Sequence, residues 1–410
     1  MKKDVLLVAN YWHFEEEKLS SRYRSFADIL CKRYNLEVIT SSFCHLKKKH
    51  RNISELSINK LPYKITMLYE KGYKKNIGIE RIVSYTQFGK NVLSYIKNRK
   101  KPDLIIVSVP SLAVADYVSK YAKNNCIPLI VDIQDLWPEA FKMAFNLPII
   151  SDILFMPMMI QANRIYSRAD VIMAVSDTYV KRGKDVNLDA DELSIYIGTD
   201  SKLVEKAIKN VSVPLDEGKF VIGYIGTLGY SYDIKSVIDA VKVLKDRGIS
   251  NIMLKVMGDG VCRKEFEDYA EKSNIDYVFT GLLEYGVMMK TLMQCDVAVN
   301  PIVGKSVSSI INKVSDYAAA GVPVINTQNS DEYRMLLYRY KAGINVENGD
   351  VQELANAIFT YYSDAELRKR AAINEKKLYK DLFDRNIIYY KLVDKIEELL
   401  YEKFSYEKPN

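Results

Sequence analysis

The sequence predicts two doubly wound α/β domains, each built on a parallel sheet. At 410 residues the chain exceeds the size at which one hydrophobic core usually stops growing. Short apolar runs alternate with helical patterns along its whole length, as in successive β and α units. The runs are continuously hydrophobic, which is typical of strands buried on both faces of a parallel sheet.

Ten apolar runs are expected to form strands, five in each half of the chain, and a turn-rich stretch over 194–204 separates the halves. We therefore expect a first domain over 1–198, a second over 199–385, a C-terminal helix over 386–410 that packs back toward the first domain, and a cleft between the domains. The ten strand candidates are 4–10, 36–40, 103–109, 128–133, 171–176, 220–226, 251–258, 277–281, 296–301 and 323–326.

The composition is that of an ordinary globular protein, with 48% hydrophobic residues. The five cysteines are scattered and form no CxxC pair. This usage fits a reducing compartment and argues against a disulfide framework or a zinc site. The apolar start is too short for a signal peptide, and no segment approaches the roughly 18 apolar residues of a membrane span. We expect a cytoplasmic protein.

The formal net charge of +7 is concentrated in the first half of the chain. Residues 45–101 hold 15 Lys and Arg against 3 Asp and Glu, whereas 201–410 hold 29 against 30. One domain is therefore expected to meet an anionic surface, namely phosphate groups, nucleic acid or acidic lipid. A solvated basic face is the plainer alternative.

Glycines mark three successive strand ends in the second half of the chain. Gly226 and Gly229 flank Thr227 after the first strand, Gly258 and Gly260 follow the second, and Gly281 with Leu282 follows the third. Backbone N–H groups at such strand-to-helix turns suit a phosphate. Tight βα turns need glycine in any case, so each motif alone is weak. These seven residues are candidates for donor binding.

The stretch "INKVSDYAAAGVPVIN" over 311–326 combines a cation and a carboxylate at the start of a predicted helix. Lys313 and Asp316 are three positions apart and so share a helix face. The alanines that follow permit close packing, and Gly321 is expected to end the helix. Ser308 and Ser309 add possible donors before it. The alternative is an ordinary surface Lys–Asp pair.

Taken in order, the motifs over 221–326 resemble the donor-nucleotide domain of glycosyltransferase family 4, whose fold is the two-domain GT-B fold. Residues 131–141 and 168–177 resemble matching segments of a subgroup that makes bacterial surface polysaccharides. Some positions depart from the family pattern. Ser308 and Asp316 stand where two glutamates are frequent, and Thr227 and Tyr232 stand where the family has Arg and Lys.

The resemblance implies roles for particular residues. Lys313 is expected to place its cation against the donor diphosphate, and Asp316 to accept bonds from the ribose hydroxyls. Asp135 falls where the family often has a polar residue that touches the donor sugar, while Gln134 replaces a frequent histidine. Asp135 and Lys313 are therefore the catalytic candidates.

The loop and helix after the first strand commonly contact the acceptor in this fold. His13, Arg22 and Arg24 lie there and are candidates for an acceptor phosphate. A plain loop followed by a charged helix face is an equal alternative. The "LDADE" stretch over 188–192 is expected to be a solvated loop rather than a metal motif.

The function implied is that of a retaining glycosyltransferase that needs no metal or other cofactor. It would move a sugar from a nucleoside-diphosphate donor, with UDP favoured, to a lipid-linked or glycan acceptor in bacterial capsule, O-antigen or exopolysaccharide synthesis. The basic region implies peripheral association with the inner face of the plasma membrane. The alternatives are a non-catalytic GT-B partner subunit, a UDP-sugar 2-epimerase of the same fold, and a nucleic-acid binder, which would leave the ordered motifs unexplained.

Overall fold

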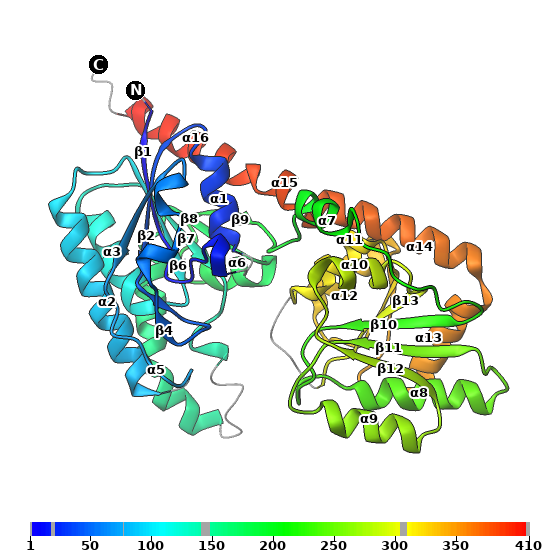
Figure 1. Ribbon diagram of the computed structural model, residues 1–410. Coiled ribbons are helices and arrows are strands. Elements are labelled where there is room, and N and C mark those ends of the chain that lie inside the picture. The colour runs from blue at the N-terminus through cyan, green and yellow to red at the C-terminus, as the bar shows by residue number, and fades with distance from the viewer. Residues whose placement is uncertain (1, 18–20, 77, 141–147, 304–309, 407–410) are drawn as a thin grey trace. The chain divides into compact units, whose positions relative to one another are not determined.

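The computed structural model describes residues 2–17, 21–76, 78–140, 148–303 and 310–406. The chain forms two compact units (Figure 1): residues 1–195 with 389–410 make unit 1, and residues 196–388 make unit 2. The chain passes between units a few residues from the expected positions 198 and 385. The last helix belongs to unit 1.

Unit 1 is built on a seven-stranded parallel sheet with the order β5-β2-β1-β6-β7-β8-β9. The strand order reverses at β1, which makes its carboxyl end a topological switch point, where ligands of such sheets usually bind. The strands are β1 (Asp4–Val8), β2 (Asn35–Ser41), β5 (Lys64–Leu68), β6 (Leu104–Val109), β7 (Leu129–Ile133), β8 (Val171–Ala174) and β9 (Asp191–Ser194), with a separate hairpin of β3 (Phe43–Cys44) and β4 (Lys49–His50).

Helices cover both faces of this sheet. In Figure 1, α2, α3 and α5 lie side by side on one face, and α1 and α16 lie together on the other. The rings of Phe26 on α1 and Tyr389 before α16 are 4.4 Å apart. The helices of unit 1 are α1 (Arg22–Leu30), α2 (Ile79–Asn98), α3 (Leu112–Asn124), α5 (Pro148–Tyr166), α6 (Asp177–Lys184) and α16 (Tyr390–Tyr406), with 3₁₀ turns η1 (Glu15–Glu17), η2 (Ile53–Glu55) and η3 (Ile58–Lys60).

Unit 2 repeats the plan with six parallel strands in the order β12-β11-β10-β13-β14-β15. Its switch point is the carboxyl end of β10. The strands are β10 (Phe220–Ile225), β11 (Ile252–Met257), β12 (Asp276–Gly281), β13 (Val297–Asn300), β14 (Val324–Asn326) and β15 (Gly343–Asn345). The helices are α7 (Ser201–Ile208), α8 (Ile234–Asp246), α9 (Arg263–Lys272), α10 (Tyr285–Leu292), α11 (Lys313–Ala320), α12 (Asp331–Tyr340), α13 (Val351–Ser363), α14 (Ala365–Leu378), the π-helix η4 (Tyr379–Phe383) and α15 (Arg385–Ile388).

All ten expected strands are present, and the strands that the sequence pattern missed lie at sheet edges. β5 and β9 are the outer strands of the first sheet, and β15 is an outer strand of the second. Their residues are exposed or only partly buried, so they lack the continuous hydrophobic run of a central strand. The expectation of a loop over 188–192 was wrong at its end, since β9 begins at Asp191.

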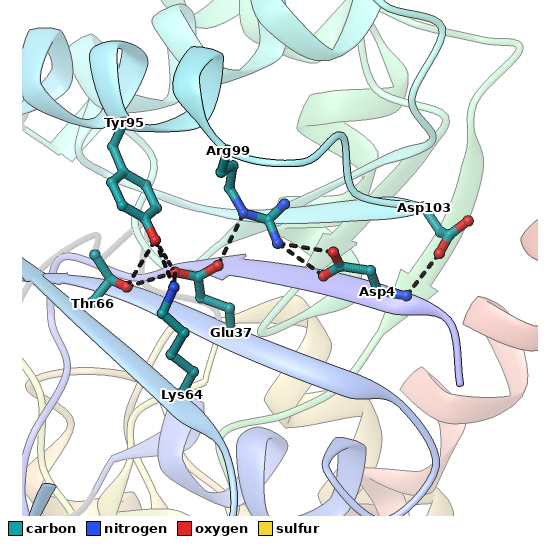
Figure 2. A network of polar contacts seen from close by, with 7 residues as sticks. All are labelled: Asp4, Glu37, Lys64, Thr66, Tyr95, Arg99 and Asp103. Carbon is teal, nitrogen blue, oxygen red and sulfur yellow. Dashed lines mark hydrogen bonds and ion pairs between the residues drawn. The ribbon is translucent and has the colours of Figure 1, made fainter. Parts of the chain in front are cut away.

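A buried polar network ties the amino ends of the strands in unit 1 (Figure 2). Arg99, at the end of α2, bonds Asp4 of β1 at 2.9 Å and Glu37 of β2 at 3.0 Å. Thr66 of β5 donates to Glu37, and Asp103 accepts from the backbone N–H of Asp4. Lys64 of β5 also pairs with Glu37, at 3.0 Å. Arg99 thus bridges two carboxylates on neighbouring strands at the edge opposite the switch point.

Replacing Arg99 with leucine should remove the ion pair of Asp4 and leave Glu37 paired with Lys64 alone, which should cost about 3 kcal/mol of unfolding free energy. The matched control is Arg33→Leu, because Arg33 pairs with Glu397 where both side chains are about half exposed; it should cost under about 1 kcal/mol. Both tryptophans, Trp12 and Trp137, lie in unit 1, so urea unfolding followed by indole fluorescence reports this unit. Equal losses in the two variants would contradict the role given to the network.

Candidate functional site

The ammonium group of Lys313, the first residue of α11, lies at the carboxyl end of β10. It donates a hydrogen bond to the hydroxyl of Tyr224 at 2.9 Å. It also lies 4.1 Å from the centre of the Tyr224 ring and 3.8 Å from that of Tyr232. Tyr224 in turn donates to the carbonyl of Thr227 at 2.8 Å. Two tyrosines therefore hold the lysine beside the first glycine turn.

No carboxylate forms an ion pair with Lys313 among the residues that the structure describes. Burial alone lowers the pKa of the Lys313 ammonium well below its usual value. The two rings provide cation–π attraction, but neither carries a charge. An anion arriving here would find a desolvated cation that needs a counter-charge.

Tyr317, one turn along α11, fixes the helix to the sheet. Its buried hydroxyl donates to the carbonyl of Val299 in β13 at 3.0 Å and accepts from the backbone N–H of Ile225 in β10 at 3.2 Å. Gly321 ends α11 in the left-handed conformation, with φ 72°, as the sequence predicts. The start of α11 is thereby held rigidly over two strand ends.

The first two glycine motifs pack against one another through their backbones. Gly226 donates its N–H to Met257 and Leu228 donates its N–H to Asp259, at 3.0 and 2.9 Å. A Cβ on Gly258 would lie 1.8 Å from the carbonyl oxygen of Gly226.

Close packing leaves no room for a side chain at Gly260 either. A Cβ on Gly260 would lie 2.3 Å from the oxygen of Leu228. Close packing of the two loops therefore explains why residues 258 and 260 are glycine, without any ligand. Of the first turn, Thr227 and Gly229 are the residues whose N–H groups these loop-to-loop bonds leave unused.

The third strand end is joined to the second. Gly281, with φ 74°, forms a β-bridge with Gly258, and the side chain of Leu282 is 82% exposed beyond it. Ser308 and Ser309 lie outside the described residues.

Asp316 points to partners different from those of Lys313. Its Oδ1 accepts from the hydroxyls of Thr199 at 2.7 Å and Tyr285 at 3.0 Å. Burial raises the pKa of Asp316, and these two bonds and the charge of Arg385 oppose that rise. Its Oδ2 makes no hydrogen bond within the described part of the chain. The carboxylate is held by the segment entering unit 2 and by α10.

In unit 1, Asp135 follows β7 at the carboxyl edge of the sheet. Its side chain remains exposed, yet burial of its surroundings raises its pKa to about 6, against the opposing charge of Arg81. Gln134 bonds back to Asp132 at 3.4 Å. Trp137 is largely buried and packs under Arg81, 4.4 Å from its guanidinium carbon.

The three acceptor candidates have different surroundings. Arg22 is buried in an ion pair with Asp132 at 3.1 Å and donates to the carbonyl of Ile195, so its charge is already matched inside the core. Arg24 lines a cavity of about 420 Å³, where it pairs with Glu15 at 2.7 Å.

His13 is buried, with its Nδ1 3.6 Å from the carboxylate of Glu17. Cys44 lies close to both, and the three side chains could in principle hold a metal ion. However, Arg51 bonds both oxygens of Glu17, at 3.0 and 3.3 Å. A cation would have to displace this guanidinium, so the cluster is a poor metal site.

Four residues at the unit 2 site were not among the sequence candidates for it: Tyr224, Tyr232, Thr199 and Tyr285. Tyr224 sits in a strand and looks like core, and Tyr232 was noted only as a departure from a family pattern. Thr199 and Tyr285 lie 117 and 31 residues before Asp316 in sequence. No local pattern connects them to it.

Comparison with known families finds a similarity within unit 2. Residues 219–364 match the family described as Glycosyl transferases group 1. This bears out the expected glycosyltransferase resemblance and supports a transferase, without specifying family 4. No curated protein matches the chain.

Comparison with solved structures confirms the GT-B fold with two Rossmann-like domains. HepE from Anabaena, crystallised with UDP, has a TM-score of 0.68 at 15% identity, covering 97% of this chain and 100% of its own. Sucrose-phosphate synthase from Thermosynechococcus elongatus gives 0.67 at 15%, covering 98% and 100%. WaaG, a glycosyltransferase of lipopolysaccharide biosynthesis, gives 0.61 at 15%, covering 96% and 99%.

The depressed pKa of Lys313 predicts a pH dependence of stability. In the unfolded chain its pKa returns to about 10.4, so between the two values the unfolded state binds more protons. The cost of burying the charged ammonium is full below the pKa of the folded state and disappears above the pKa of the unfolded state. The unfolding free energy should therefore rise with pH in this window, by up to about 1.4 kcal/mol per unit.

Lys313→Met has similar volume and no charge, so this contribution should be absent from it. Urea unfolding followed by circular dichroism at several alkaline pH values gives the difference between variant and wild type. The variant should be the more stable near neutral pH, and its advantage should shrink as pH rises. A difference independent of pH would mean that the ammonium is not desolvated.

Proposed function

We propose that this chain is a retaining, metal-independent glycosyltransferase. It takes a sugar from a nucleoside-diphosphate donor, with UDP favoured, and transfers it to a lipid-linked or glycan acceptor in bacterial surface-polysaccharide synthesis. Unit 2, with its match to group 1 glycosyltransferases, binds the donor, and unit 1 binds the acceptor. Retention and metal independence rest on the family resemblance.

The observation that carries this proposal is the desolvated ammonium of Lys313 without a carboxylate partner. Breaking the bond between the sugar C1 and the phosphate oxygen leaves the nucleoside diphosphate with added negative charge. A cation already fixed at the strand edge stabilises that charge without reorganising. The N–H groups of Thr227 and Gly229 and the start of α11 supply further donors.

The proton of the attacking acceptor hydroxyl passes to the leaving phosphate oxygen, so no enzymic base is required. Asp135 contacts the transferred sugar in this scheme. With a pKa of about 6, its carboxyl is mostly ionised at neutral pH.

Asp316 supplies the nucleotide contact. Thr199 and Tyr285 fix Oδ1, and Oδ2 accepts from a ribose hydroxyl. A carboxylate with one oxygen pinned loses little freedom when it binds. The structure of HepE with UDP-glucose, a fold relative at 14% identity, supports a UDP-sugar as the donor class.

The surface of unit 1 supports peripheral membrane binding. The loop before α2 exposes Lys74 and Lys75. Apolar side chains are exposed nearby in sequence and on α5: Ile79, Ile82, Val83, Ile153, Leu154, Met156 and Ile160. In the described parts of the chain, no helix is both long and apolar enough to cross a bilayer. Basic groups beside anionic lipid contribute about 1 kcal/mol each.

Lys313→Met and Asp316→Asn should each weaken UDP binding in calorimetric titration. Lost charge-assisted bonds of about 1.5–3 kcal/mol correspond to about tenfold to hundredfold in affinity. Lys235→Met is the matched control, because this lysine of the same unit pairs with Glu265 at the surface. Wild-type affinity in both site variants would refute this placement of the donor. If the protein releases no UDP from any UDP-sugar in a hydrolysis assay, the alternative of a non-catalytic subunit is favoured.

The Lys74→Ala, Lys75→Ala double variant should lose about 2 kcal/mol of binding to vesicles that contain acidic lipid. The control is Lys242→Ala, Lys264→Ala, two exposed lysines of unit 2. Co-sedimentation at low and high salt measures both. Wild-type binding should weaken as salt rises; binding that ignores salt, or equal loss in the control, would count against an electrostatic surface.

A further inference from the structure

A second cation without a carboxylate partner lies in unit 1, at the start of α2. Arg81 is 9% exposed. Its guanidinium donates to the hydroxyls of Tyr85 and Tyr11, both at 2.8 Å, and to the carbonyl of Asn76 at 2.6 Å. All three acceptors are neutral. No described carboxylate forms an ion pair with it.

Aromatic rings surround this guanidinium. Its central carbon lies 4.4 Å from the ring of Trp137, 5.3 Å from that of Tyr85 and 5.5 Å from that of Tyr73. Such rings hold and orient a guanidinium, but they do not neutralise it. The arrangement resembles the one around Lys313 in its chemistry: a desolvated cation among tyrosines.

Two more groups lie beside Arg81, and one of them, Lys48, adds positive charge. The ammonium of Lys48 lies 4.5 Å from the Tyr73 ring centre and 3.4 Å from Nδ1 of His45. Burial, Lys48 and Arg81 together lower the pKa of His45 to about 3. Burial and Arg81 lower the pKa of Lys48 as well. Burial is the largest of these causes for His45, whose imidazole is therefore neutral near neutral pH.

Among the described residues, the nearby carboxylates form no ion pair with Arg81 or Lys48. Glu70 is buried and accepts from Ser84 at 2.8 Å, and its pKa is raised by burial. Asp135 is exposed and interacts with Arg81 through space without a hydrogen bond. Solvent reaches the cluster, because Lys48 and His45 are partly exposed.

We propose that Arg81, Lys48 and His45 form an anion site in unit 1 that binds a phosphate-type group of the acceptor. The inference rests on the proposed function for the identity of the ligand as acceptor, and it deepens that function by giving the acceptor a negative charge. Arg81 offers planar donors that match phosphate oxygens, and Lys48 adds a mobile point charge. Nδ1 of the neutral His45 accepts from the Lys48 ammonium at 3.4 Å, so its Nε2–H donates a third bond.

The acceptor candidates predicted from the sequence differ from this site in how their charges are paired. The charge of Arg22 is already matched by Asp132 and that of Arg24 by Glu15. Arg81 and Lys48 have no such match among the described residues. The basic composition of 45–101 is thus concentrated, in part, at the carboxyl edge of the sheet, where a substrate of this fold is expected.

Inorganic pyrophosphate is a suitable probe, titrated by calorimetry into Lys313→Met protein so that the cation of unit 2 does not contribute. Binding should be measurable, and Lys48→Met in that background should weaken it roughly tenfold or more. Arg81→Lys, which keeps the charge but loses the planar donors, should also weaken it. Lys90→Met, an exposed lysine on the same helix, should bind like the parent.

Absence of pyrophosphate binding, or equal affinity in the Lys48→Met and Lys90→Met proteins, would overturn the anion site. Lys48 is partly exposed, so its variant keeps the test valid even if Arg81→Lys fails to fold. UDP titration of the Lys48→Met single variant separates the two proposals. Unchanged UDP affinity with lost pyrophosphate affinity supports both, whereas wild-type protein that fails to bind UDP refutes the donor site and leaves the pyrophosphate result to stand by itself.

Discussion

A desolvated ammonium group without a counter-charge is the constraint on which the account of this protein depends. Lys313 is held at the carboxyl end of β10 by Tyr224 and Tyr232, and Tyr317 fixes its helix to two strands. A charge taken out of water costs several kcal/mol unless it is paired. The folded protein bears the cost of burying this charge at the carboxyl ends of the strands, where folds of this kind usually bind ligands. An anionic leaving group is therefore the simplest partner for the ammonium of Lys313.

Charged side chains are paired differently at the amino and carboxyl ends of the strands in unit 1. At the amino edge, Arg99 satisfies Asp4 and Glu37 in a closed network (Figure 2), which stabilises the strands. At the carboxyl edge, Arg81 is bonded to neutral oxygens and ringed by aromatic side chains. The first arrangement is complete without a ligand, whereas the second, like Lys313 in unit 2, is one that we propose an anion completes. In this proposal, stability and binding depend on opposite ends of the same strands.

The sequence predicted the fold well because central strands of a parallel sheet have a continuous apolar pattern, and it missed β5, β9 and β15 because edge strands lack one. It also placed Lys313 correctly at the start of a helix that ends at Gly321. No local sequence pattern could predict the residues that surround Lys313 and Asp316, since Tyr224 and Thr199 lie about 90 and 117 residues away from them in sequence. Gly258 and Gly260 looked like phosphate-loop glycines, yet close backbone packing already accounts for them. Arg22 looked like a surface cation until the fold brought Asp132 to it.

The most direct test of the central claim is a crystal structure of the protein with UDP bound. The account predicts that a diphosphate oxygen lies within hydrogen-bond distance of Nζ of Lys313 and that a ribose hydroxyl bonds Oδ2 of Asp316. Nucleotide bound elsewhere, or bound at this strand edge with the ammonium still directed only at Tyr224 and Tyr232, would contradict it.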